Sequence, residues 1–372
     1  MTIVDKRRSV FVFGASLAYL VLFGLLYCTH TINSVPLVIY DEDQTQFSRE
    51  LIQAFDDSER FRIVHYAATQ EDMDRAMDEK EAYVAIHIPR KFAQDAKSGR
   101  SATVLLMASG ANILIANTVS TAAQEIIAAF SKNTGAGLAE SNLAQMPVLA
   151  KNKIGPAELR LRILNNPTQS YLSFFVPGLA MAAIQQGIFL AVGASIQHEL
   201  QYPNELRTTT PWQPMFAKLL SYSLSAVIAF FLTIETGIHA FQIPGKAPLF
   251  YFFLLATSFI VCAVSVSALL ASISNSELTF TRISIAYSVP AFVMSGYTWP
   301  QESMDSLGKA LSYLFPLTYF SNTLRELMLA GHSAYLYRHC AILLLIGVFS
   351  SYLAARCFGA KLEQKIKLPS VI

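Results

Sequence analysis

The residues able to do chemistry are not spaced for catalysis or metal binding. No GxSxG, HExxH or CxxC pattern occurs, and the seven histidines and four cysteines are scattered. No G-x-x-x-x-G-K-[ST] arrangement occurs, and the pair Gly245-Lys246 lacks the leading glycine and the hydroxyl residue of a phosphate-binding loop. We therefore predict no catalytic residue, no metal site and no cofactor bound by this chain.

Glu235 is the one carboxylate well inside an apolar run, FFLTIETGIHAF. An ionisable group within a membrane span is a functional candidate by default. Counted from Phe216 at 1.5 Å per residue, Glu235 lies about 29 Å along a helix, near its outer end. With His239 one turn further, it forms either an ion pair at the membrane interface or a buried relay.

Gln185 and Gln186 are adjacent amides in another apolar run. Neighbouring residues on a helix face different directions, so one of them could line a translocation path. Hydrogen bonding between helices explains both equally well, because unpaired amides are costly in hydrocarbon. Both interpretations stay open.

A polar segment, QHELQYPNELRTTTPWQPMFAK, separates two apolar runs. Glu199, Glu205 and Arg207 give it a charged surface, and Thr210 with Pro211 can start the next helix. The segment either presents these charges to a soluble partner or is simply a solvated loop.

The composition places the chain among membrane proteins. Of 372 residues, 53% are hydrophobic and only 15% charged. The net charge of +2, without a block of like charges, indicates no nucleic-acid partner. Apolar runs long enough for a bilayer lie at 9–29, 171–196, 216–240, 248–273, 282–298 and 339–358. We predict an α-helical integral membrane protein with six transmembrane helices.

Basic residues at both ends set the predicted orientation. Lys6, Arg7 and Arg8 precede the first run, which is too long for a signal peptide and is interpreted as an uncleaved anchor. The tail is also basic, with Lys361 and Lys365. By the positive-inside rule, both termini are expected in the cytoplasm.

Between the first two spans, the pattern changes to that of a small folded domain. Short β-rich runs at 35–40, 61–66, 82–88 and 102–108 alternate with helical patterns. This alternation predicts an inserted α/β domain with a parallel or mixed sheet, on the extracytoplasmic side. A long helix is expected over 112–130, and a loop or broken helix over 132–156.

The predicted domains are therefore three. Residues 1–30 hold the cytoplasmic start and first transmembrane helix, 31–165 the extracytoplasmic α/β domain with long helices, and 166–372 a five-helix membrane region with a basic cytoplasmic tail. Within the last, 299–330 is too polar for a further span, and Pro316 interrupts its apolar face. It is either a re-entrant helical hairpin on the outer side or an amphipathic loop on the membrane surface.

This layout resembles the ABC type-2 exporter permeases that carry a large extracytoplasmic domain. Four segments support the resemblance in the right order over nearly the whole chain. They are IYDEDQTQFSRELIQAF, VAIHIPRKFAQDAKSG (Ile88, Pro89, Phe92, Gly99), NNPTQSYLSFFVPG (Asn166, Pro167, Pro177, Gly178) and SGYTWPQESMDSLGKALSYLFPLTYF (Ser295, Gly296, Pro300, Met304, Pro316, Thr318, Tyr319).

The resemblance implies a permease subunit of an ATP-driven exporter in the bacterial inner membrane. ATP and Mg²⁺ would bind a separate cytoplasmic ABC subunit, and a second permease copy or paralogue would complete the transporter. A periplasmic adaptor and an outer-membrane channel are further expected partners. The ATPase-coupling loop would hold Glu199, Glu205, Arg207, Thr210 and Pro211, and the outer hairpin gate Pro300, Met304, Pro316, Thr318 and Tyr319.

One alternative stays open at this point. A non-transporting receptor or cell-envelope scaffold could also carry a large outer domain on a membrane bundle. It would need no ATP-binding partner.

Overall fold

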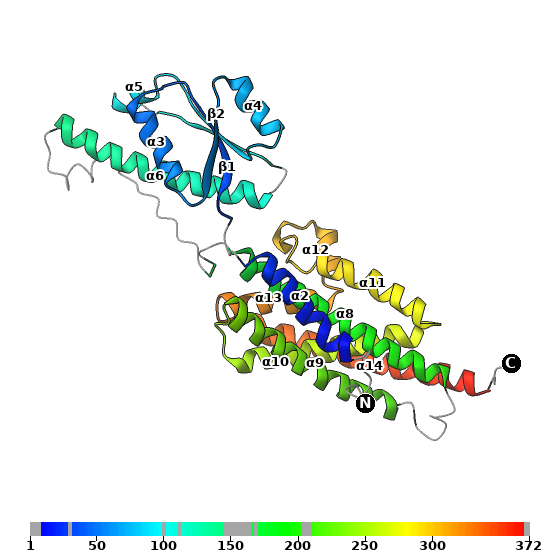
Figure 1. Ribbon diagram of the computed structural model, residues 1–372. Coiled ribbons are helices and arrows are strands. Elements are labelled where there is room, and N and C mark those ends of the chain that lie inside the picture. The colour runs from blue at the N-terminus through cyan, green and yellow to red at the C-terminus, as the bar shows by residue number, and fades with distance from the viewer. Residues whose placement is uncertain are drawn as a thin grey trace. The chain divides into compact units, whose positions relative to one another are not determined.

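The computed structural model describes residues 9–28, 32–98, 102–110, 113–143, 165–166, 170–202, 210 and 212–367. The chain forms two compact units (Figure 1). The first comprises Met1–His30 and Ile163–Ile372, and the second Thr31–Arg162.

The first unit is a helical bundle. Its elements are η1 (Val10–Gly14), α2 (Ala15–Leu26), α8 (Tyr171–Gln201), α9 (Trp212–Phe241), α10 (Leu249–Ile273), α11 (Glu277–Val293), η3 (Gln301–Ser303), α12 (Ser306–Ser312), α13 (Pro316–Leu329) and α14 (Leu336–Lys367). Among the described residues, α8, α9, α10 and α14 are long and apolar enough to cross a bilayer. The apolar stretch Val10–Leu26 and helix α11 are shorter.

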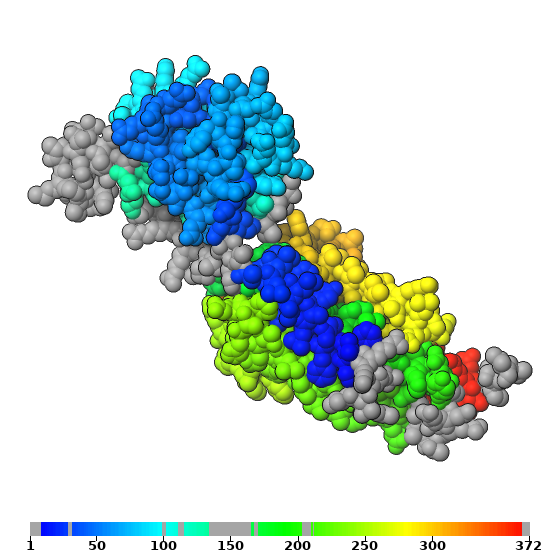
Figure 2. Space-filling view, viewed as in Figure 1, coloured from blue at the N-terminus to red at the C-terminus, as the bar shows by residue number. Residues whose placement is uncertain are grey.

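Helix α8 lies at the centre of the bundle. It packs against α2, α9, α10 and α11, and Figure 2 shows α2 and α11 flanking it on the visible face. Gly187 permits one close approach, because a Cβ there would lie 2.1 Å from the Phe11 carbonyl oxygen. Small residues allow such backbone contacts between membrane helices. Where α2 ends and α8 begins, the rings of Tyr27 and Tyr171 meet edge to face, with their centres 5.1 Å apart.

The second unit contains a four-stranded mixed sheet. The strands β1 (Val35–Asp41), β2 (Phe61–Tyr66), β3 (Val84–Ile88) and β4 (Leu105–Ala108) lie in the order β2-β1-β3-β4. Strand β1 is parallel to β2 and β3, whereas β3 and β4 are antiparallel. The helices between them are α3 (Gln46–Asp56), α4 (Gln70–Asp78) and α5 (Phe92–Lys97), and α6 (Ile113–Leu143) follows β4.

Alternation along the strands builds a core on each face of the sheet. Leu37 and Ile39 pack with α3, α5 and α6, whereas Val38, between them, packs with Met73 and Ala76 of α4. Successive side chains of a strand point to opposite faces, so the helices form a layer on each side.

The acidic turn after β1 is a local scaffold. Asp41 Oδ2 accepts a hydrogen bond from Ser48 Oγ at 2.6 Å, which ties β1 to α3. Asp43 Oδ2 accepts one from the Ala93 amide at 3.1 Å, which reaches α5. A hydrogen bond from Tyr40 is the main cause that lowers the pKa of Glu42, and one from His87 adds to it. These carboxylates are therefore engaged within the fold.

Helix α6 corrects one expectation from the sequence. The segment 132–156 was expected to be a loop or broken helix, but α6 continues through Leu143, and 144–156 lie outside the described residues. Gly135 and Gly137 lie inside this helix. A glycine in a helix costs only about 1 kcal/mol relative to alanine, so two of them do not end a long helix by themselves.

Candidate functional site

Glu199 does not project from a loop, as its sequence context suggested. It lies in the last turns of α8, and its Oε1 is 2.8 Å from Lys218 Nζ on α9. The Glu199 and Lys218 side chains are only 22% and 11% exposed. Lys218 also donates to the hydroxyl and, at 3.5 Å, to the carbonyl of Ser195. The charge of Glu199 thus joins α8 to α9.

The rest of the predicted coupling segment is shorter than expected. Helix α8 continues to Gln201 and α9 begins at Trp212, so the connection between them is 202–211. Thr210 is exposed, and its carbonyl accepts a hydrogen bond from the Gln213 amide at 3.0 Å. Glu205, Arg207 and Pro211 lie outside the described residues.

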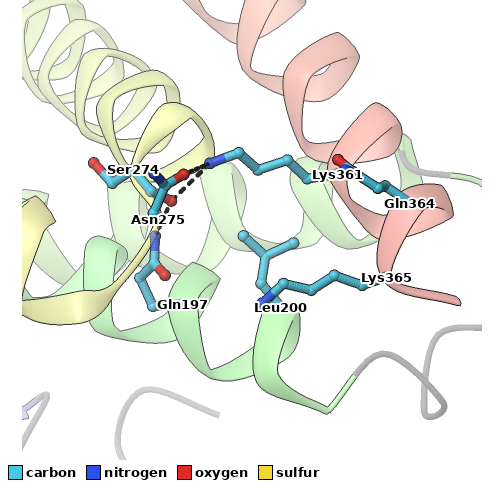
Figure 3. A pocket seen from close by; sticks show the side chains of 7 residues that line it. All are labelled: Gln197, Leu200, Ser274, Asn275, Lys361, Gln364 and Lys365. Atoms are coloured by element: carbon cyan, nitrogen blue, oxygen red, sulfur yellow. Dashed lines mark hydrogen bonds between the residues drawn. The ribbon is translucent and has the colours of Figure 1, made fainter. Parts of the chain in front are cut away.

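Gln197, which the sequence did not single out, fastens the same end of α8 to α10. Its buried Nε2 donates to the Ala271 carbonyl at 2.7 Å and to the Ser274 carbonyl at 3.1 Å. Lys361 of α14 donates to the same Ser274 carbonyl at 2.8 Å (Figure 3). The loop end of α8 is therefore bonded to α9 and α10, and α14 joins it through a shared carbonyl. A displacement of this end would be passed to three neighbouring helices.

The adjacent amides of α8 face different surroundings. Gln185 is 2% exposed, and its Nε2 has no hydrogen-bond partner among the described residues. Gln186 Nε2 donates to Ser284 Oγ of α11 at 3.2 Å. Gln186 thus makes the expected contact between helices, whereas Gln185 carries an unpaired buried amide. Gln186 Oε1 is also buried without a partner in the described part of the chain. A group left in this state costs about 1–3 kcal/mol, so each glutamine still has one unpaired atom that a polar path could satisfy.

Glu235 is not bonded to either of these glutamines. Its side chain is 52% exposed, and Oε2 is 3.1 Å from His239 Nε2. No hydrogen bond or ion pair joins Glu235 to Gln185 or Gln186 in the described part of the chain. The arrangement is that of a surface ion pair, the first of the two interpretations of this residue.

The segment 299–330 forms two helices after a short helical turn. Pro300 precedes η3, and Pro316 occupies the first turn of α13, where its missing N–H costs nothing. Met304 is half-buried between η3 and α12. Tyr319 donates from its hydroxyl to the Tyr313 carbonyl at 3.0 Å, which links α13 to the end of α12.

Thr318 is the one predicted hairpin residue with an unpaired polar atom. It is 2% exposed, and its hydroxyl has no partner among the described residues. This hydroxyl, Gln185 Nε2, Gln186 Oε1 and Glu199 Oε2 are the four predicted site atoms in α8 and α13 that are buried without a partner among the described residues.

Arg325 holds the α12–α13 hairpin to the bundle, and sequence reasoning missed it. Its Nη1 donates to the Gly296 carbonyl at 3.0 Å, and its Nη2 to Asn322 Oδ1 at 2.9 Å. Its guanidinium also lies over the rings of Phe174 and Tyr297, at 5.1 and 5.3 Å. Arg325 thus joins α13 to the start of α8 and the end of α11. A lone cation within an apolar helix, LRELML, was the available signal.

Two glycines from the segments that support the family resemblance lie against the residues around Arg325. Gly296 has φ +89°, and a Cβ there would lie 2.7 Å from Asn322 Oδ1. A Cβ on Gly178 would lie 2.6 Å from the ring of Tyr297. Both positions require glycine because a larger residue would push the hairpin away from α8 and α11.

Comparison with known proteins decides the family. The family model described as ABC-2 family transporter protein matches residues 7–356. The chain belongs to the ABC-2 family of transporter proteins. The resemblance noticed in the sequence is thereby confirmed.

The relatives of this ABC-2 protein include two permeases and a further ABC transporter. It is 24% identical over 312 residues to the probable multidrug ABC transporter permease YbhR of Escherichia coli K12, covering 82% of this chain and 80% of that one. It is 23% identical over 313 residues to the inner membrane transport permease YhhJ of the same strain, covering 81% and 78%. ABC transporter G family member 20 of Dictyostelium discoideum is 19% identical over 176 residues, which is 45% of this chain and 24% of that protein.

This ABC-2 protein is therefore a transmembrane permease subunit of an ABC transporter and a multi-pass membrane protein. It is a transport component rather than an enzyme, and ATP hydrolysis belongs to a partner subunit. The family favours a transporter over a receptor or a scaffold. Among the described residues, no three His, Cys, Asp or Glu side chains gather as metal ligands would.

Proposed function

We propose that this permease exports its substrate outward across the bacterial inner membrane, driven by a cytoplasmic ATP-binding subunit that docks at the α8–α9 connection. The observation that carries the proposal is the bonding at the loop end of α8. Glu199 ties it to Lys218 of α9, and Gln197 ties it to the end of α10. A push on the connection would move these helices together.

The proposed topology has six spans with both termini in the cytoplasm. The stretch Val10–Leu26 and helix α11 would complete the four long spans. At 1.5 Å per residue, each is about 25 Å long, slightly less than a hydrocarbon core of about 30 Å, and local thinning of the bilayer accommodates the difference. The second unit, Thr31–Arg162, then lies on the outer side.

The proposed mechanism needs two states of the bundle, each favoured by a different nucleotide state of the partner. ATP and Mg²⁺ would bind the partner, and a second permease copy or paralogue would face this one. The hairpin residues Pro300, Met304, Pro316, Thr318 and Tyr319 would gate the outer end, and Gln185 would lie beside the path. An adaptor and an outer-membrane channel would act beyond it. Since one relative is named a multidrug permease, drug-like molecules are the first substrates to test.

Site-directed crosslinking tests the docking step. Thr210→Cys places a thiol on the exposed connection, and Thr298→Cys places one on an exposed residue beyond the other end of the bundle. Both are made in a Cys28→Ser background, because Cys28 is exposed. Co-expressed with its ATP-binding subunit, the Thr210→Cys chain should crosslink to that subunit and the Thr298→Cys chain should not. Crosslinking from Thr298→Cys alone would reject the proposed docking side.

Two further measurements test where ATP is hydrolysed and on which side of the membrane the second unit lies. The purified chain should hydrolyse no ATP, whereas the complex should. A membrane-impermeant maleimide should label Glu79→Cys, in the second unit, from outside intact spheroplasts. Labelling of that residue only after lysis would put the unit in the cytosol and overturn the export topology.

A further inference from the structure

A cavity of about 230 Å³ lies where α8, α10 and α14 end together. Figure 3 shows Lys361 and Lys365 reaching into it from α14, the first toward Ser274 and Asn275 and the second toward Leu200. Gln197 and Gln364 complete the lining. Because one water occupies about 30 Å³ of liquid, the cavity has room for a polar group of several atoms.

Among the described residues that line the cavity, two are cations and none is a carboxylate. Lys361 Nζ donates to two neutral acceptors, the Ser274 carbonyl at 2.8 Å and Asn275 Oδ1 at 3.3 Å. In the described part of the chain, no carboxylate forms an ion pair with Lys361 or Lys365. Glu199 of α8, which lies next to Leu200 in the chain, is bound to Lys218 instead. Two ammonium groups in one cavity repel each other, and an anion between them would reverse that repulsion.

Hydrogen-bond donors remain for such an anion. An ammonium has three protons, and Lys361 uses two of them on Ser274 and Asn275. Lys365 makes no hydrogen bond to a described residue, so all its donors face the cavity or the solvent. The side-chain amide of Gln364 adds another donor group. Several donors with positive charge suit a phosphate group.

Exposed apolar residues flank part of the cavity lining in the chain. Ile273 and Leu278 are 50% and 61% exposed, on either side of Ser274 and Asn275 in the chain. Ile273 is the last residue of α10, a helix long and apolar enough to cross a bilayer, so the lining residues Ser274 and Asn275 directly follow a segment that would meet acyl chains. A ligand that joins a phosphate to an apolar tail satisfies both features.

We propose that this cavity binds the headgroup phosphate of an anionic phospholipid. Basic pockets between membrane helices are suited to such headgroups. The bound phosphate would be held by donors of α14 and would lie against the loop end of α8, the same end that is proposed to receive the push from the ATP-binding subunit. The assignment to the cytoplasmic leaflet rests on the proposed topology, whereas the site itself does not.

Native mass spectrometry of the purified full chain tests the site without the ATP-binding subunit, so its outcome is independent of the proposed coupling. Phosphatidylglycerol should stay bound, and phosphatidylcholine should not. Lys361→Gln with Lys365→Gln should weaken phosphatidylglycerol binding by about tenfold or more, since charged hydrogen bonds are lost. The corresponding double change to arginine should keep binding within about twofold, because it keeps both charges.

Arg282→Gln is the matched control. Arg282 is an exposed cation near the start of α11, close in sequence to the same helix ends, and it does not line the cavity. Its loss should leave binding within about twofold, since a general attraction to anionic lipid is shared by many charges. If the Lys361 change prevents folding, Lys365→Gln alone serves, since Lys365 supports no hydrogen bond to a described residue.

Three results would overturn the proposal. One is equal binding of phosphatidylglycerol and phosphatidylcholine, and another is an equal loss in the Arg282→Gln and lysine variants. The third is retention of inorganic phosphate in place of the lipid. Phosphatidylglycerol that resists displacement by inorganic phosphate supports a lipid source.

Discussion

Removing Lys218 should cost the bundle a measurable part of its stability. Lys218→Met would leave Glu199 as an unpaired carboxylate at 22% exposure, with Oε2 already lacking a partner in the described part of the chain. Exposed ion pairs contribute about 0–1 kcal/mol, and breaking a buried one costs about 3–5 kcal/mol. At 11% and 22% exposure, this pair is close to the buried limit. We expect a loss of about 2–4 kcal/mol.

The double variant separates the ion pair from the packing around it. Glu199→Gln with Lys218→Met removes both charges, so the uncompensated carboxylate disappears and the loss should fall to about 1–2 kcal/mol. The assay is equilibrium unfolding of the purified chain in mixed micelles with sodium dodecyl sulfate, followed by circular dichroism. A double variant whose loss equals the sum of the two single losses would show that the pair is not coupled and refute the reasoning.

The ion pair between Glu235 and His239 is the matched control for this cycle. Its nitrogen and oxygen are 3.1 Å apart, but the side chains are 52% and 78% exposed. Glu235→Gln should therefore cost less than about 1 kcal/mol in the same assay. In the complex with its ATP-binding subunit, Lys218→Met should keep ATP hydrolysis while transport falls, and Glu235→Gln should change neither.

Three further changes test the packing and the second unit. Gly296→Ala should destabilise the bundle by about 1–3 kcal/mol, because φ is +89° and an asparagine oxygen lies 2.7 Å from the new Cβ, whereas Gly14→Ala, with only an ordinary contact at 3.6 Å, should be nearly neutral in thermal unfolding. Gly187→Ala should cost about 1–3 kcal/mol by pushing η1 off α8, and disulfide trapping between the two helices should slow. Glu42 has a pKa lowered below the ordinary 4.5, so its stabilisation of the second unit is present above that value and is lost as the pH falls further. Tyr40→Phe removes the largest cause and should flatten this dependence, as measured by hydrogen exchange of residues 35–98 corrected for intrinsic rates.

The sequence located elements well where burial alone defines them. The β-rich runs at 61–66 and 82–88 coincide with or contain β2 and β3, because runs rich in apolar and β-branched residues favour strands. The interruption at Pro316 falls at the start of α13. A residue without an N–H has few places in a helix, so its position was predictable.

Helix ends in the bundle were less predictable. The apolar run ended at 196, but α8 continues to Gln201 through Glu199. Hydropathy shows which residues avoid water, and it does not show that a charged residue has a partner on another helix. Lys218, which makes the last turns of α8 tolerable, stands 19 positions further along the chain.

Contacts between distant segments were beyond sequence reasoning. Gln197 bonds to Ala271, and Arg325 bonds to Gly296 across two different helices. Such pairs depend on how each helix is rotated about its axis, and a single sequence with weak amphipathic patterns does not fix that rotation. Arg325 could be noticed as an isolated cation, but its acceptor could not.

The ring contact between Tyr27 and Tyr171 bears on whether the helical bundle can assemble without the second unit. These residues flank the excursion that leaves α2 and returns at α8, and their ring centres are only 5.1 Å apart. Contact between these two side chains places the end of α2 near the start of α8, so the residues that remain at 28–30 and 163–170 would be long enough to join the two helices. The helices should therefore assemble around a minimal splice in place of residues 31–162, so the sheet-bearing module could be exchanged between permeases as a cassette.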